Sequence, residues 1–197
     1  MSERFHRAAF FMGFASMISA SCSQSVPHDL TTEIDPSDGS ALRDVPLIDH
    51  AHWREYSARE DPLASHQPEH IDCGRAGWYV EPAFEVPLLE IDTNYCNYVL
   101  LEHPLLVDLA KGDVVSVEVR HYDLLAPEPA AAHLAIWFAD SLEWESYVSI
   151  PSAAAVEVAH WRVKHARKAG EVVRLHLHNH GQNTWLIAAL SARSAAP

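Results

Sequence analysis

The sequence predicts an all-β fold, an antiparallel β-sandwich, preceded by an export signal and a flexible tether. From about residue 71 onward the apolar runs are short and are separated by turn residues. One of these runs, Val114–Tyr122, alternates valine with polar residues, which indicates a half-buried strand. A series of such runs with few helical stretches is typical of two packed antiparallel sheets.

The N-terminal segment has the pattern of an export signal. A short basic start with Arg4, His6 and Arg7 precedes an apolar run over residues 8–20, which is too short to span a bilayer comfortably. Small residues then lead to Cys22.

This ending resembles the lipobox of bacterial lipoproteins, in which the cysteine is lipidated and becomes the mature N-terminus. The resemblance implies that residues 1–21 are a signal peptide and that Cys22 carries lipid, so that the exported protein is anchored to the cell envelope. Ser23 is not Asp, which implies the outer membrane. Ordinary signal cleavage after Ser21 and a cytosolic protein are the alternatives.

Residues 22–70 are expected to form a mostly disordered tether. The segment is rich in Pro, Asp, Glu, Ser and His and lacks apolar periodicity, except for a short docking segment around 48–56. In the alternative interpretation, Trp53 and Tyr56 pack on the domain and the segment is ordered.

The domain itself is expected over residues 71–193. Its glycine turns, strand starts and late hairpins loosely resemble jelly-roll carbohydrate-binding and galactose-binding-like modules, a resemblance of architecture that says little about function. The predicted strands are 78–80, 83–86, 98–101, 105–109, 114–122, 132–139, 143–150, 156–163, 172–178 and 184–190.

Two cysteines remain in the domain, Cys73 and Cys96. In an exported protein such a pair is expected to form a disulfide. A two-cysteine metal site is the weaker alternative, because the sequence has no CxxC motif.

The stretch from Leu175 to Trp185 is the candidate binding surface. Leu175 and Leu177 should face the core, and the histidines that alternate with them should face outward. The turn that follows adds amides and an indole, which suit a polar ligand such as a carbohydrate. The predicted ligand-binding residues are His176, His178, Asn179, His180, Gln182, Asn183 and Trp185.

A zinc or copper site is the main alternative use of these histidines. Strand geometry lets two neighbouring members of the row share an ion, either His176 with His178 or His178 with His180. A third nitrogen would come from His133 or His121. A plain row of exposed histidines is the remaining interpretation.

Charge and motifs limit the functions that remain. The net charge of −13 argues against nucleic acid as a partner. The sequence has no nucleophile elbow and no phosphate-binding loop, and Glu143 with Glu145 is a carboxylate pair of a kind that is usually just solvated. We therefore expect a lipid-anchored binding or interaction module with a carbohydrate or an envelope protein as its partner, and a metal-binding domain or metalloenzyme that uses the histidine strand is the alternative.

Overall fold

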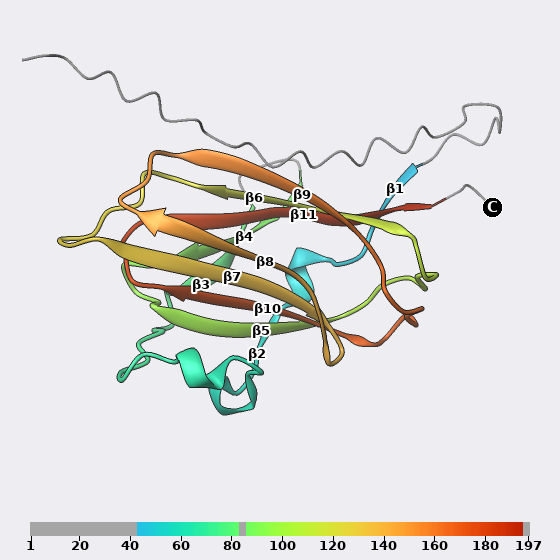
Figure 1. Ribbon diagram of the computed structural model, residues 1–197, viewed down its shortest axis with the longest axis horizontal. Coiled ribbons are helices and arrows are strands. Elements are labelled where there is room, and N and C mark those ends of the chain that lie inside the picture. The colour runs from blue at the N-terminus through green and yellow to red at the C-terminus, as the bar shows by residue number, and fades with distance from the viewer. Residues whose placement is uncertain (1–42, 83–85, 195–197) are drawn as a thin grey trace, which may run out of the picture. The chain divides into compact units, whose positions relative to one another are not determined.

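The computed structural model describes residues 43–82 and 86–194, and these fold as two antiparallel sheets that face each other (Figure 1). One sheet has six strands in the order β3-β4-β11-β6-β9, with β1 paired to β11, and the other has five in the order β2-β5-β10-β7-β8. The strands are β1 Arg43–Pro46, β2 Arg54–Glu55, β3 Trp78–Glu81, β4 Leu88–Asp92, β5 Tyr98–Pro104, β6 Val114–His121, β7 Ala130–Phe138, β8 Ser141–Ile150, β9 Ala155–Arg162, β10 Val172–Asn179 and β11 Thr184–Ser194. Three short 3-10 helices complete the elements: η1 His50–His52, η2 Ala58–Glu60 and η3 Ala64–His66.

The strand order identifies the sandwich as jelly-roll-like. Of the strands β4 to β11, four lie in one sheet as β4-β11-β6-β9 and four in the other as β5-β10-β7-β8. From β4 to β11, every connection between consecutive strands crosses from sheet to sheet, except the β7–β8 hairpin. This is the double-sheet arrangement of a jelly roll, and it confirms the predicted fold class.

The core lies between the sheets and is formed by alternate residues of each strand. Val115, Val117 and Val119 of β6 are buried, as their alternation predicts. Leu175 and Leu177 of β10 are buried against them from the other sheet. The histidines that alternate with these leucines, His176 and His178, therefore lie on the outer face of the five-stranded sheet.

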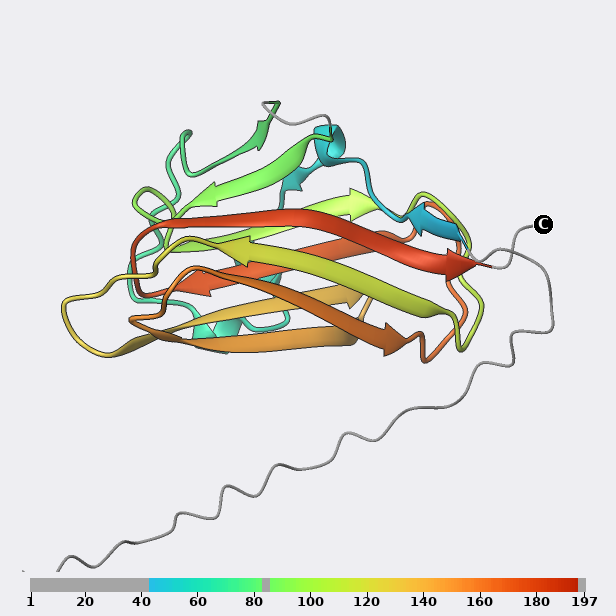
Figure 2. The same cartoon turned by 90° about the horizontal axis from the view of Figure 1, so that it is seen from above.

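The segment before residue 71 differs from the expected tether. Strand β1 pairs with the end of β11, where Arg43 lies opposite Ser194, and Figure 2 shows β1 beside that end of the red strand. Leu47, Ile48 and Trp53 join the core. The domain thus begins by residue 43, because edge pairing and a few apolar anchors order a segment that has no periodic pattern of its own. Residues 1–42, with the predicted signal peptide and Cys22, lie outside the described residues.

Two strand predictions also need correction. The run 105–109 forms no strand but a loop, in which the amide of Leu105 donates to the carbonyl of Glu171 and Leu109 makes a single bridge to Arg167. The actual fourth strand is Leu88–Asp92, which we did not predict. The predicted strand 83–86 falls mostly outside the described residues.

The cysteine prediction is confirmed. Cys73 and Cys96 form a disulfide, with their Cα atoms 3.9 Å apart, below the expected window of about 4.4–6.8 Å.

None of the helices in residues 43–82 and 86–194 is both long and apolar enough to cross a bilayer.

Candidate functional site

The outer face of the five-stranded sheet carries rows of polar and aromatic side chains that the strand register aligns. In one row, His178 of β10 lies opposite Tyr98 of β5 and His133 of β7, and His133 lies opposite Tyr147 of β8. In the next row, His176 lies opposite Leu100 and Ala135, and Ala135 lies opposite Glu145. The predicted histidines therefore meet partners from every neighbouring strand.

Half of this face is covered by the chain itself. Residues 54–67, which we call the strap, lie beside β5 and β10 (Figure 1, teal). The strap is held by β2 pairing with β5, by the amide of Tyr56 donating to the carbonyl of Leu100, and by the ring of Tyr56 at 5.4 Å from the guanidinium of Arg174.

Asp61 is the main polar contact between the strap and the sheet. Its Oδ2 accepts a hydrogen bond of 2.7 Å from the Tyr98 hydroxyl and lies 2.7 Å from Nδ1 of His176. The side chains of Asp61 and His176 are both 0% exposed.

Burial and hydrogen bonding act in opposite directions on this group. Burial raises the pKa of Asp61, but hydrogen bonds from His176, the Leu63 amide and Tyr98 outweigh it and hold that pKa below its ordinary value. Burial, and then the bond to Asp61, raise the pKa of Tyr98 well above its usual range. Tyr98 is therefore a neutral donor to an ionised carboxylate.

The strap overturns the prediction of exposed histidines. His176 and His178 point away from the core, as the leucine alternation predicts, but both are buried. The burial of His176 could not be predicted from the strand pattern, because its buried partner Asp61 lies 115 positions earlier in the chain.

The β7–β8 half of the same face is open. Tyr147 is 61% exposed, and its ring stacks on the His133 imidazole with centroids 4.1 Å apart and planes 2° from parallel. Oε2 of Glu145 lies 3.1 Å from Nε2 of His133 and accepts a 3.5 Å bond from the Tyr147 hydroxyl. Partial burial, and then the Glu145 carboxylate, raise the pKa of Tyr147, so its hydroxyl stays neutral. The exposed outward residues of this half, together with His180, form what we call the open patch: Ala131, Glu145, Tyr147, Ser149 and His180.

His180 connects the open patch to the loops at one end of the sandwich. Its ring lies 4.3 Å from that of His178, and its amide donates to the carbonyl of Ala131. Beside it is a hollow of about 340 Å³ that Thr93, Leu125 and Gln182 help to line. His180 and Gln182 are the predicted ligand residues that remain exposed there.

The other predicted residues of this turn brace it. The Asn179 side chain donates to the carbonyl of Gly181 and accepts from the indole of Trp185. Asn183 donates to the carbonyl of Asp123 and adopts a φ of 122°. Trp185, expected to offer a flat face to a ligand, is 1% exposed and belongs to the core.

Gly181 is needed for the turn to pack. A Cβ at this position would lie 2.7 Å from Cδ1 of Ile150 and 2.9 Å from the Leu125 carbonyl oxygen. The turn that carries His180 is therefore fixed against the neighbouring loops.

The structure divides the predicted metal ligands. His133, His176 and His178 lie on one face, but His121 is in the six-stranded sheet, where it lies 4.7 Å from the Trp185 ring and bonds the carbonyl of Tyr122 through Nδ1. Within the part of the chain that the structure describes, no group of three or more His, Cys, Asp or Glu side chains is placed to hold a metal ion. Zinc or copper binding stays a prediction.

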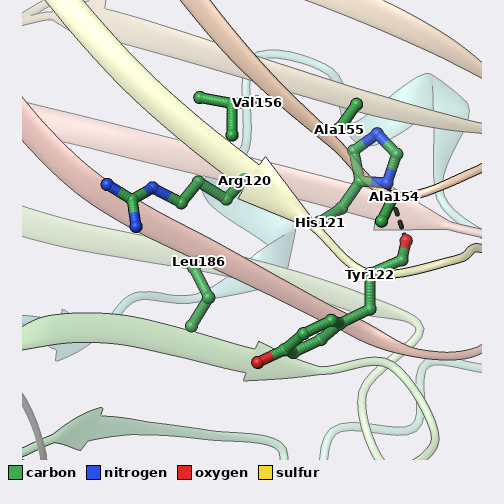
Figure 3. A pocket seen from close by; sticks show the side chains of 7 residues that line it. All are labelled: Arg120, His121, Tyr122, Ala154, Ala155, Val156 and Leu186. Atoms are coloured by element: carbon green, nitrogen blue, oxygen red, sulfur yellow. Dashed lines mark hydrogen bonds between the residues drawn. The ribbon is translucent and has the colours of Figure 1, made fainter.

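A second hollow lies on the six-stranded sheet. It measures about 360 Å³, and Figure 3 shows Leu186, Val156, Tyr122 and Arg120 around it. Arg120 already contacts the carboxylate of Glu118 at 2.5 Å. The walls of this hollow are thus largely apolar, and its one charged lining residue already has a partner.

The carboxylate pair noted in the sequence is also divided. The Glu143 side chain is 0% exposed and lies 3.2 Å from the guanidinium of Arg167, whereas that of Glu145 is 42% exposed.

The residues that sequence reasoning missed are Asp61, Tyr98 and Tyr147. Only Tyr147 left a signal, because Glu145, Tyr147 and Ser149 alternate along one side of β8.

Comparisons with known proteins describe the fold and little else. No protein-family model matches the chain, and no curated protein matches it. A family 11 carbohydrate-binding module from Clostridium thermocellum, in complex with a beta-1,3-1,4-mixed-linked tetrasaccharide, is similar at 11% identity and a TM-score of 0.44, covering 79% of this chain and 98% of that one.

Two further solved structures are similar at the same level. TmCBM27, a carbohydrate-binding module described for specific mannan recognition, has 8% identity and a TM-score of 0.48, and the match covers 79% of this chain and 98% of that one. CBM28, specific for non-crystalline cellulose, has 8% identity and a TM-score of 0.44, with 73% and 99% covered. TM-scores below 0.5 carry no argument about ligand or site.

Proposed function

We propose that this protein is a carbohydrate-binding module whose ligand rests on Tyr147 in the open patch. The observation that carries the proposal is a tyrosine ring that is 61% exposed and is held flat by a parallel imidazole beneath it. Its orientation is fixed before any ligand arrives, so binding costs little side-chain entropy.

The groups around the ring suit a sugar. The apolar C–H face of a pyranose packs on an aromatic face, while its hydroxyls bond to groups at the ring edge. Here the Tyr147 hydroxyl and the Glu145 carboxylate provide a donor and acceptors at one edge. The residues two positions before and after His133 on the same face of β7 are alanines, Ala131 and Ala135, with short side chains.

A binding assay against a library of glycans, followed by calorimetry on the best binder, tests this proposal. We expect Tyr147→Ala to weaken binding by about tenfold or more, since losing an aromatic contact costs on the order of 1.5 kcal/mol. Tyr79→Ala is the matched control, because Tyr79 is 40% exposed on the other sheet. Equal affinity of the Tyr147→Ala variant and the wild type would overturn the proposal.

We also propose that the module is exported and anchored through lipid on Cys22. The Cys73–Cys96 disulfide supports export, because such bonds persist in oxidising compartments. The first described residue, Arg43, lies beside Ser194 at the C-terminal end of β11. The turn that carries His180 lies just before Thr184, at the N-terminal end of the same strand. An anchor attached through residue 43 would therefore leave the loop end directed away from it.

Membrane fractionation tests the anchor. The Cys22→Ala variant should lose labelling with a radioactive fatty acid and leave the membrane fraction, while the wild type keeps both. Retention of the variant in the membrane at the wild-type level would contradict lipid anchoring without affecting the carbohydrate proposal.

A further inference from the structure

We propose that the open patch selects cationic amino sugars, with the ammonium group of the ligand between the Tyr147 ring and the Glu145 carboxylate. This rests on the proposed function and names the ligand class of the same site. Three features support it: the position of Glu145, the absence of Lys and Arg from β7 and β8, and the formal charge of the whole chain.

Glu145 has one carboxylate oxygen committed within the described residues. Both of its contacts, with Nε2 of His133 and the Tyr147 hydroxyl, fall on Oε2. The side chain is 42% exposed, so Oε1 lies where a ligand on Tyr147 can approach it. A carboxylate beside an exposed aromatic ring suits a protonated amine, which gains from the negative face of the ring and from a charge-assisted hydrogen bond.

The strands of the open patch, β7 and β8, carry no lysine or arginine that could compete with a ligand amine, and His133 beside Glu145 is charged only if protonated. Of the five open-patch residues, Glu145 is the one acid, and none is Lys or Arg. The arginine on this face of β10, Arg174, is 16% exposed and donates to the carbonyl of Ala139.

The charge of the whole chain acts in the same direction. With a formal net charge of −13, the protein attracts cations and repels acidic glycans before contact. Local and long-range electrostatics therefore both favour a glycan with free amines over its neutral or acidic counterpart.

Calorimetry with matched tetrasaccharides tests the inference. The probes are a β-1,4 glucosamine tetramer and its fully N-acetylated form, at pH 7, where the formal net charge of −13 applies and the sugar amines are partly protonated. We expect the free-amine tetramer to bind the wild type about tenfold more tightly, equivalent to about 1.4 kcal/mol. That preference should shrink in 0.5 M salt, because screening weakens exposed charge pairs.

Glu145→Gln is the decisive variant, because it keeps the side-chain size and an acceptor for His133. It should bring the two affinities within about threefold of each other, whereas Glu90→Gln on the other sheet should leave the preference unchanged. A thermal unfolding curve checks that Glu145→Gln is folded.

The outcomes separate this inference from the proposed function. Equal binding of both tetramers with full dependence on Tyr147 would overturn the amino-sugar inference and leave the carbohydrate proposal standing. A preference that survives Glu145→Gln, or no binding of the free-amine tetramer, would also overturn the inference. Binding of both tetramers without dependence on Tyr147 would overturn the inference and the proposed function together.

Discussion

The two halves of the outer face of the five-stranded sheet use similar residues for different purposes. On the β5–β10 half, Tyr98 and His176 are buried under the strap and bond to Asp61. On the β7–β8 half, Tyr147 and His133 stack on one another, and the tyrosine faces solvent. Residue type therefore does not distinguish the buried tyrosine–histidine group from the exposed one that we propose as a binding site; the covering segment makes the difference.

The largest expected difference between the halves is in stability. Asp61→Ala removes the acceptor of two buried donors, Tyr98 and His176, and should lower the free energy of unfolding by about 3 kcal/mol. Urea unfolding measures the loss. Glu60→Ala, an exposed neighbour in the strap, should change it by less than about 0.5 kcal/mol. Equal stabilities of the two variants would mean that the strap does not depend on Asp61.

This contrast also shows what the sequence can predict. Leucine alternation in β10 correctly placed the histidines on the outer face, and the valines of β6 correctly defined a core strand. The sequence indicated the strap only through the alternative in which Trp53 and Tyr56 pack on the domain, because its main contact comes from one aspartate in a polar segment and not from a periodic pattern. Trp185 was predicted as a ligand-binding residue but lies in the core, because an aromatic residue after a polar turn fits the edge of a binding site as well as a core strand.

A second, smaller effect should appear when the pH falls. The segment leading to the strap is held by His103, whose Nε2 accepts from the Asp49 amide and whose Nδ1 donates to the Pro104 carbonyl. His50 accepts from the Trp53 indole and contacts the Ala188 carbonyl. Burial lowers the pKa of both histidines.

The direction of the pH effect follows from these shifts. The folded state binds fewer protons than the unfolded state below about pH 6.5, so stability should fall as the pH drops through that value. Asp61, whose pKa is also lowered, should keep its contribution until the pH falls below about 3.8. The loss should not exceed about 1.4 kcal/mol per histidine and pH unit.

Urea midpoints at pH 7.5 and pH 5.5 measure the pH effect. The wild type should be less stable at pH 5.5, and the double variant His50→Gln, His103→Gln should show a shallower dependence. A wild type that is equally or more stable at the lower pH would show that these histidines do not hold the segment.

The smallest expected change in stability is on the open half. Tyr147→Ala should lower the free energy of unfolding by about 0.5 kcal/mol, since an exposed cross-strand pair contributes little. Urea unfolding measures this together with the Asp61 variants. A loss above about 2 kcal/mol would mean that the ring serves mainly to cover His133, and the two halves would then differ only in degree.

Backbone amide chemical shifts, recorded while the glycan that binds best in the library assay is added, test the central claim most directly. The account predicts that the largest shifts fall in β7 and β8 and at His180, while β6 and β9 change little. Largest shifts around the hollow at Arg120, Tyr122 and Leu186 on the six-stranded sheet would contradict it.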